Sequence, residues 1–172
     1  MVKKINNKLI LGIDPGYARV GWAVLKKTPP TSSGQAKNNL NLINFGCLET
    51  GKEIPHAERL KYLNLEIKKI IKKYKPKILA IEDLFFFKNL KTATKVAEAR
   101  GVILMTGIEN NLVIQEFTPL QIKQALVGYG RADKNQVQQM VKIILKLKEV
   151  PKPDDAADAI AIAICGANNS KY

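Results

Sequence analysis

The sequence contains little cysteine, little histidine and no long apolar run. Its two cysteines, Cys47 and Cys165, lie in apolar segments without a C-x-x-C pair, which predicts two buried thiols and argues against a disulfide framework or a zinc site. The one histidine, His56, is expected at the surface, at the start of a predicted helix. No stretch reaches the roughly 18 to 20 apolar residues that a membrane span needs, and residues 1–8 are too short and polar for a signal peptide. We therefore expect a cytoplasmic protein that makes no contact with a membrane.

Acidic residues are scarce relative to basic ones. The chain has 28 Lys and Arg against 15 Asp and Glu, a formal net charge of +13. This excess makes polyanions the expected partners, although solubility alone can also account for surface lysines. A length of 172 residues with 46% hydrophobic residues predicts one domain over residues 1–172 with a single sizeable core.

Apolar patterning predicts an α/β fold. We expect strands at 9–14, 20–25, 40–48, 78–82 and 112–117, and helices at 56–73, 89–110, 119–127, 134–148 and from about 154 onward. The first three strands predict an antiparallel meander, and the helix after them makes a crossover, so the fourth strand should run parallel to one of the three. Residues 26–39, rich in Pro, Ser, Gly and Asn, predict a flexible hairpin loop.

Four acidic residues lie at strand ends or in the first turn of a predicted helix. A structural role can explain any one of these positions but not all four together. Asp14 ends the apolar strand LILGID before a Pro-Gly turn, Glu82 closes the strand ILAIE, and Asp155 and Asp158 lie three apart in DDAAD, on one helix face. Turn chemistry, solvation or helix capping can each explain one of them. If the fourth strand lies beside the first, however, and the last helix ends over both, the four carboxylates meet. Such a cluster must protonate or bind cations, and oxygen ligands favour Mg²⁺ or Mn²⁺.

Two ions about 4 Å apart are the clamp used for phosphodiester hydrolysis, so a strongly basic chain with such a site should act on nucleic acid. Five segments resemble the RuvC Holliday junction resolvases of the ribonuclease H-like superfamily: GIDPG, AIEDLFF, EARG, QIKQALVGYGRADKNQVQQMV and DAADAIAIA. The resemblance covers nearly the whole chain. It implies a mixed five-stranded sheet and an endonuclease that resolves Holliday junctions by paired symmetric nicks in recombination and repair.

The resemblance also implies partners and roles. Asp14, Glu82, Asp155 and Asp158 would be catalytic and would bind two Mg²⁺ ions, with Mn²⁺ able to substitute. The implied partners are four-way junction DNA, a second copy in a homodimer, and the RuvA and RuvB branch-migration proteins. The implied DNA-binding residues are Phe85, Phe86, Lys88, Lys123 and Lys134. Taken alone, the lysines read as exposed helix residues and the phenylalanines as core.

Several assignments stay open at this stage. Alignment of DAADAIAIA selects Asp155 as the metal ligand and leaves Asp154 as the helix cap, while Asp83 should point away from the site. The implied dimer helix is 89–110, whose small residues Gly101 and Gly107 can pack against a partner or against the chain's own sheet. Thr118 and Asp133 should cap the two following helices.

Three rival functions remain. A nuclease of the YqgF type, with the same superfamily fold, would act on another substrate. An actin-like ATPase also uses a strand ending in Asp-x-Gly, but it needs a second such lobe, and the sequence has no second Asp-x-Gly strand turn. A junction-binding protein without catalysis would use the acids only structurally, and replacing Asp14 would separate it from a metal-dependent nuclease.

Overall fold

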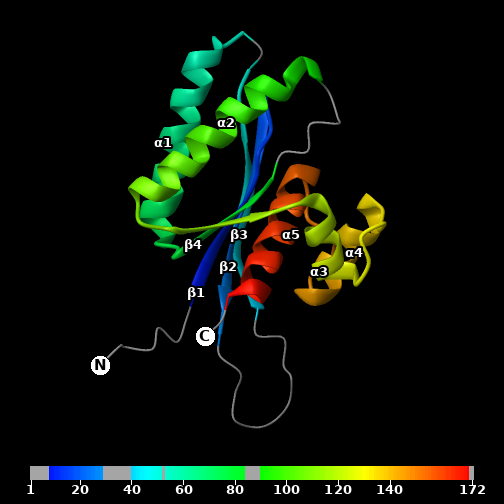
Figure 1. The fold of residues 1–172 in the computed structure, drawn as a ribbon. Coiled ribbons are helices and arrows are strands. Elements are labelled where there is room, and N and C mark those ends of the chain that lie inside the picture. The colour runs from blue at the N-terminus through cyan, green and yellow to red at the C-terminus, as the bar shows by residue number, and fades with distance from the viewer. Residues whose placement is uncertain (1–7, 29–39, 52, 84–89, 171–172) are drawn as a thin grey trace, which may run out of the picture.

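The computed structural model describes residues 8–28, 40–51, 53–83 and 90–170, with side chains in the second helix described from residue 92. Figure 1 shows the elements in chain order from blue to red. They are β1 (Lys8–Asp14), β2 (Arg19–Lys27), β3 (Leu40–Glu49), α1 (His56–Tyr74), β4 (Ile78–Glu82), α2 (Leu90–Glu109), β5 (Val113–Phe117), α3 (Pro119–Val127), α4 (Lys134–Ile144) and α5 (Asp154–Asn169).

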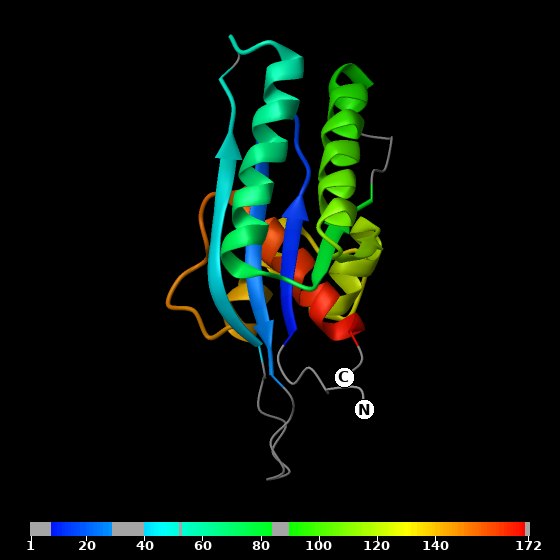
Figure 2. The same cartoon turned by 90° about the vertical axis from the view of Figure 1, so that its left-hand side faces the viewer.

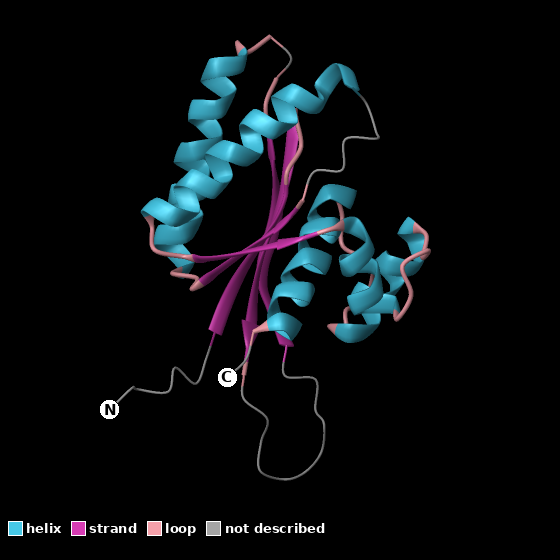
Figure 3. Cartoon of the chain, viewed as in Figure 1, coloured by secondary structure: helices cyan, strands magenta, loops and turns pink. Residues whose placement is uncertain are grey.

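The strands form one mixed sheet in the order β3-β2-β1-β4-β5, drawn in magenta in Figure 3. The pairs β1–β2 and β2–β3 are antiparallel, whereas β4 runs parallel to both β1 and β5. The predicted five-stranded mixed sheet, its meander and its crossover are therefore confirmed. β1 lies at the centre because the crossover through α1 returns the chain beside it, which is the arrangement on which the predicted carboxylate cluster depends.

Helices cover both faces of the sheet. Figure 2 shows α1 and α2 side by side on one face, with α5 on the opposite face. Under α1 and α2, the inward residues Leu63, Ile67 and Ile103 pack against Leu11 and Ile13 of β1 in one buried cluster. Because successive strand residues point to opposite faces, the alternate residues of β1 and β4 face α5, and these include Asp14 and Glu82.

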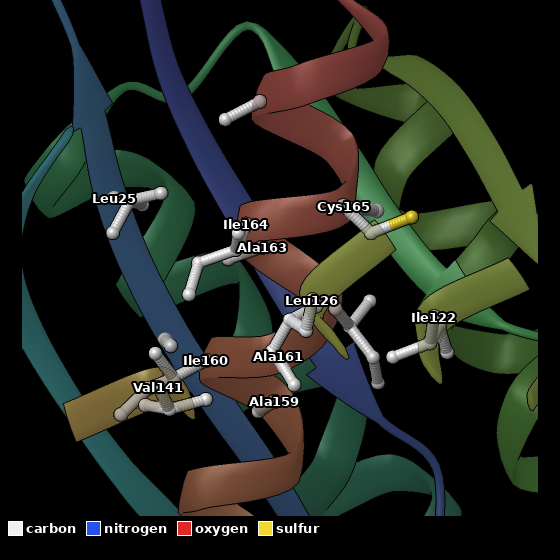
Figure 4. Packing of buried hydrophobic residues seen from close by; sticks show 14 of the residues in the cluster. Leu25, Ile122, Leu126, Val141, Ala159, Ile160, Ala161, Ala163, Ile164 and Cys165 are labelled. Carbon is white, nitrogen blue, oxygen red and sulfur yellow. The ribbon is translucent and has the colours of Figure 1, made fainter. Parts of the chain in front are cut away.

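α5 is the most buried helix segment in the described chain. Its segment AIAIAICGA, residues 159–167, is apolar around the whole helix, a pattern typical of a helix enclosed on all sides. Figure 4 shows Ile160 and Ile164 of α5 among Leu25 of β2, Leu126 of α3 and Val141 of α4. Each such aliphatic side chain stabilises the fold by about 1.5 to 3 kcal/mol. This packing fixes the position of the first turn of α5 over the sheet.

The two predicted capping boxes are present. Thr118 accepts a hydrogen bond from the Gln121 main-chain nitrogen at the start of α3, and Asp133 does the same with Gln136 at the start of α4. The expectation that Asp154 caps α5 is wrong, because Pro153 takes the N-cap position and Asp154 is the first helical residue. The freed Asp154 side chain pairs with a lysine instead.

Two boundaries differ from the sequence prediction. α4 ends at Ile144 rather than at 148, because Lys146 adopts a left-handed conformation (φ 53°). The Leu147 and Lys146 amides then donate to the carbonyls of Lys142 and Ile143, a Schellman motif without its usual glycine. β2 and β3 extend the hairpin to the pair Lys27–Leu40, so the loop predicted at 26–39 begins two residues later; residues 29–39 lie outside the described chain.

Three further expectations concern single side chains and membrane contact. Cys165 is buried as predicted, whereas Cys47 is only partly buried. His56 is half-buried rather than a surface residue, because it pairs with Glu98 of α2 and stacks beside Tyr17. Among the described residues, none of the helices is both long and apolar enough to span a bilayer.

Candidate active site

Asp14 and Glu82 lie next to one another at the ends of two parallel strands. The β1–β4 register pairs Ile13 with Ile81, and the next residue on each strand is the acid. Both acids share their face of the sheet with the residues that pack under α5. The charge of Glu82 contributes to raising the pKa of Asp14, as expected of two carboxylates this close. The adjacency predicted from the strand order is therefore present.

Two glycines bring the first half of α5 against these strands. Gly21, the antiparallel partner of Asp14, lies so close to α5 that an added Cβ would overlap the main-chain oxygen of Asp155. A Cβ on Gly12 would likewise overlap the main chain of Ala159. Glycine is required at both places because the backbone of a helix and the backbone of a strand are in direct contact there. The contact at Gly21 places the start of α5 over the end of β1.

The electrostatics of Asp14 show that the four predicted acids act on one another. Desolvation by burial is the largest cause that raises the pKa of Asp14, to about 8 from an ordinary 3.8. The charges of Glu82, Asp158 and Asp155 raise it further, in that order, and the ammonium of Lys134 opposes them. A carboxylate in these surroundings holds a proton at neutral pH unless a cation joins it. The structure therefore brings the four acids into one electrostatically coupled group.

Asp155 forms an ion pair with Arg19, the first residue of β2, which follows the turn after Asp14. Arg19 Nε lies 3.2 Å from Asp155 Oδ2, and Arg19 Nη2 lies 3.0 Å from Glu49 Oε1 on β3. A hydrogen bond with the Cys47 thiol and the charges of Asp155 and Glu49 raise the pKa of Arg19, so it stays charged. Arg19 thus partly neutralises one of the four acids.

Lys134, the first residue of α4, contacts two aspartates of α5. Its Nζ lies 3.1 Å from Asp158 Oδ2 and 3.2 Å from Asp154 Oδ2. Burial disfavours its charge, but the hydrogen bonds and charges of these two carboxylates outweigh burial and raise the pKa of Lys134. For Asp158, burial raises the pKa although Lys134 opposes it, whereas Lys134 lowers the pKa of the exposed Asp154. The sequence prediction that Lys134 belongs to this region agrees with its place in the structure.

The donor set fits hard divalent cations better than any softer metal. The coupled group offers carboxylate oxygens alone, the ligands that Mg²⁺ and Mn²⁺ take, and burial together with the neighbouring negative charges raises the pKa of Asp14. Within the described ranges, no three acid, histidine or cysteine side chains are already arranged around a single point as ligands. Here Asp155 and Asp158 are paired with Arg19 and Lys134 through their Oδ2 atoms.

Of the other predicted DNA-binding residues, the structure describes Lys123. Lys123 is in α3 with a half-buried side chain, and none of its contacts within the described chain ties it to the four acids. Phe85, Phe86 and Lys88 lie outside the described residues. Asp83, which is predicted to point away from the site, forms an ion pair with Arg100 of α2 at 3.2 Å.

Two arginines were missed by the sequence reasoning. Arg19 follows the Pro-Gly turn closely and opens β2, so its nearness to Asp14 in sequence was an available signal. Its pairing with Asp155 depends on where α5 packs, which local patterns do not give. Arg100 stood in the quoted segment EARG, yet no role was assigned to it.

Comparison with known proteins agrees with this geometry. A family model described as "Crossover junction endodeoxyribonuclease RuvC" matches residues 10–166. The protein of that name from Halothermothrix orenii is 49% identical over 161 residues, which are 94% of this chain and 93% of that protein.

Two solved structures extend the likeness to three dimensions. The Thermus thermophilus RuvC structure matches with a TM-score of 0.82 and 32% identity, over 92% of this chain and 93% of that one. The structure of T. thermophilus RuvC in complex with Holliday junction substrate matches with the same TM-score and identity, over 93% of each chain. The chain therefore belongs to the RuvC family of crossover junction endodeoxyribonucleases.

Proposed function

We propose that this protein is a structure-selective DNA endonuclease that resolves Holliday junctions by paired symmetric nicks, in recombination and repair. The observation that carries the proposal is the coupling of Glu82, Asp155 and Asp158 to the buried Asp14 at the end of the central strand. Family membership supports the reaction, and the related T. thermophilus protein has been seen with Holliday junction substrate. The net charge of +13 suits a partner as densely charged as DNA.

In this proposal Asp14, Glu82, Asp155 and Asp158 hold two Mg²⁺ ions, which Mn²⁺ can replace. Bound there, such ions activate water and neutralise charge on the leaving oxygen of a phosphodiester. The strand ends fix Asp14 and Glu82, while the α5 residues Asp155 and Asp158 would leave their cation partners to bind the ions. Asp14 would give up its proton on binding a cation, because the positive charge would offset the burial and the repulsion that raise its pKa.

Lys134 supplies the positive charge that faces the substrate. Its ammonium contacts Asp154 and Asp158 in the metal-free protein and remains protonated. Once Asp158 turns to a cation, the Nζ of Lys134 is available to a neighbouring phosphate and can offset negative charge that develops during cleavage. Lys123 is proposed to hold a neighbouring phosphate, and Phe85, Phe86 and Lys88 to contact the unpaired bases and backbone at the branch point.

A homodimer follows from the same proposal, because a four-way junction has two-fold symmetry and is cut on two strands. Gly107 of α2 packs into the chain's own sheet, against Leu79 and Ile114, whereas a Cβ on Gly101 would meet nothing within 4 Å. On α2, Met105 is 56% exposed and Ile108 is 60% exposed. We assign this outer face of α2 to the second copy. Sedimentation of Met105→Lys should then show monomer where the parent protein shows dimer.

The test of the function compares a synthetic four-way junction with a linear duplex of the same sequence, in Mg²⁺ and in EDTA. Asp14→Asn is the matched control, since it removes one charge and keeps nearly the same shape. Paired symmetric nicks in the junction alone, dependent on Mg²⁺ and absent from Asp14→Asn, are the expected result. Junction binding without nicking in Mg²⁺ or Mn²⁺ would overturn the enzymatic proposal, and equal cutting of the duplex would overturn its selectivity.

A further inference from the structure

Arg100 of α2 contacts the main chain of Glu82 from the side of the sheet opposite α5. Its Nε donates to the Glu82 carbonyl oxygen at 3.1 Å. Its Nη2 pairs with Asp83 Oδ1 at 3.2 Å and also with Glu116 Oε2. The Arg100 side chain is only 14% exposed. One guanidinium therefore joins α2, the last residue of β4 and the neighbouring strand β5.

This contact is at the end of the paired part of β4. The β4–β5 ladder ends with the pair Glu82–Phe117, and the last bond across it runs from the Asp83 amide to the Phe117 carbonyl at 2.8 Å. The β1–β4 register ends one residue earlier, at Ile81. The carbonyl of Glu82 thus receives its donor from a side chain of α2 on the face away from the other acids.

We propose that Arg100 is a positioning residue for Glu82: it fixes the main chain at the end of β4, and so the direction in which the Glu82 carboxylate meets the divalent cations. The inference rests on the proposed function for the role of Glu82 as a metal ligand. Arg100 does not itself reach the metal site, because its contacts are to a main-chain oxygen and to two acids on the α2 side. Removing an outer partner of this kind weakens metal affinity or activity by about 10- to 100-fold.

The arrangement offers substitutions that separate positioning from general stability. Asp83 and Glu116 are each about half exposed, so solvent reaches both acids when the charge of Arg100 is removed. The double variant Asp83→Asn, Glu116→Gln replaces both ion pairs by neutral amide oxygens, which can still accept from the largely buried guanidinium, and it keeps the hydrogen bond from Arg100 to Glu82. Arg100→Gln removes the charge and the Nε donor. Arg100→Lys keeps the charge and one donor group, but lacks the fork that reaches the carbonyl and both acids together.

The experiment measures Mn²⁺ affinity by calorimetry without DNA, junction affinity in EDTA, and the rate of nicking against Mg²⁺ concentration. Arg100→Gln should bind Mn²⁺ about tenfold more weakly and need correspondingly more Mg²⁺. It should bind the junction as the parent does. Arg100→Lys should recover part of the loss, and the double variant should match the parent.

Two results would overturn the inference. One is unchanged Mn²⁺ affinity in Arg100→Gln. The other is an equal loss in the double variant, which would mean that the ion pairs, rather than the bond to Glu82, matter. Circular dichroism shows whether Arg100→Gln folds. If it does not, the test is Arg100→Lys, which must bind Mn²⁺ more weakly than the double variant if Arg100 positions Glu82. A parent protein that binds Mn²⁺ but does not nick would refute the proposed function alone, since the calorimetric comparison stands without activity.

Discussion

Arg19 Nε on β2 and Asp155 Oδ2 on α5 lie 3.2 Å apart, so one of the four acids of the coupled group is already paired with an arginine. The pair is partly exposed, with side-chain exposures of 46% and 31%. Its contribution to folding is therefore small, as is usual for an exposed ion pair. The ion pair has a larger effect on metal affinity. The fixed positive charge of Arg19 competes with a metal ion for Asp155 and so weakens metal binding.

Replacing Arg19 by Gln should tighten Mn²⁺ binding by a few-fold, up to the roughly fivefold that an exposed ion pair can contribute. Calorimetric titration of the metal-free protein measures this directly. Arg19→Lys keeps the positive charge and is the matched control, expected to bind Mn²⁺ as the parent does. Weaker binding by Arg19→Gln would show that Arg19 orders Asp155 for the metal rather than competing with it.

Lys134 should affect the chemical step more than metal binding. Lys134→Gln removes the ammonium that contacts Asp154 and Asp158, and we expect nicking at saturating Mg²⁺ to fall about 100-fold, as for loss of one preorganised donor. Single-turnover cleavage of a labelled junction gives the rate. Lys148→Gln, at an exposed position after α4, removes the same charge and should leave the rate within twofold of the parent. Equal losses in both variants would point to overall charge instead.

Asp14 should make the metal-free protein less stable as the pH rises. Its pKa is 3.8 in ordinary surroundings and about 8 in the fold, so between these values the unfolded chain has released a proton that the folded chain keeps. The free energy of unfolding then falls with pH across this window, by at most about 1.4 kcal/mol per pH unit. Asp14→Asn cannot titrate, so it should be more stable than the parent at pH 8.

Urea unfolding in EDTA at pH 5, 6.5 and 8 measures this difference. The gap in stability between Asp14→Asn and the parent should widen with pH, because only the parent loses stability through Asp14. A constant gap would mean that Asp14 is ionised in the folded protein throughout the range, and that the other acids do not repel it as described.

Gly21 should be intolerant of any side chain. A Cβ at this position overlaps the main-chain oxygen of Asp155, so Gly21→Ala must displace the start of α5 from β1. We expect a loss of about 1 to 3 kcal/mol in urea unfolding, typical of overpacking, and weaker Mn²⁺ binding. Gly101→Ala is the contrasting change, because nothing lies within 4 Å of its added Cβ. At protein concentrations too low for the dimer to form, it should raise stability by about 0.5 to 1 kcal/mol through helix propensity. Equal stability of the two variants would contradict the close approach.

Local patterns in the sequence were sufficient for most of the fold. Alternation and capping signals predict the elements, and the crossover rule places β4 parallel to one of the three meander strands. The rule does not say which one, so the meeting of Asp14 and Glu82 depends on β4 lying beside β1, as it does in the structure. The end of α4 was not predictable in the same way. Lys146 takes a left-handed conformation that the sequence usually marks with glycine, so no stop signal stood at Ile144.

The contacts of α5 show what local patterns cannot give. The spacing of Asp155 and Asp158 placed them on one helix face, but their partners Arg19 and Lys134 come from elements that only tertiary packing brings near. The same is true of Asp154, whose predicted capping role is taken by Pro153. Resemblance to the RuvC family, rather than physical reasoning from spacing, was what selected Asp155 over Asp154.

The most direct test of the account is a crystal of the protein soaked in Mn²⁺, with an anomalous difference map. Peaks are expected within coordination distance of carboxylate oxygens of Asp14, Glu82, Asp155 and Asp158, with the side chains of Asp155 and Asp158 turned from Arg19 and Lys134. Peaks elsewhere, or a saturated crystal in which these four acids bind no manganese and keep their present partners, would contradict it.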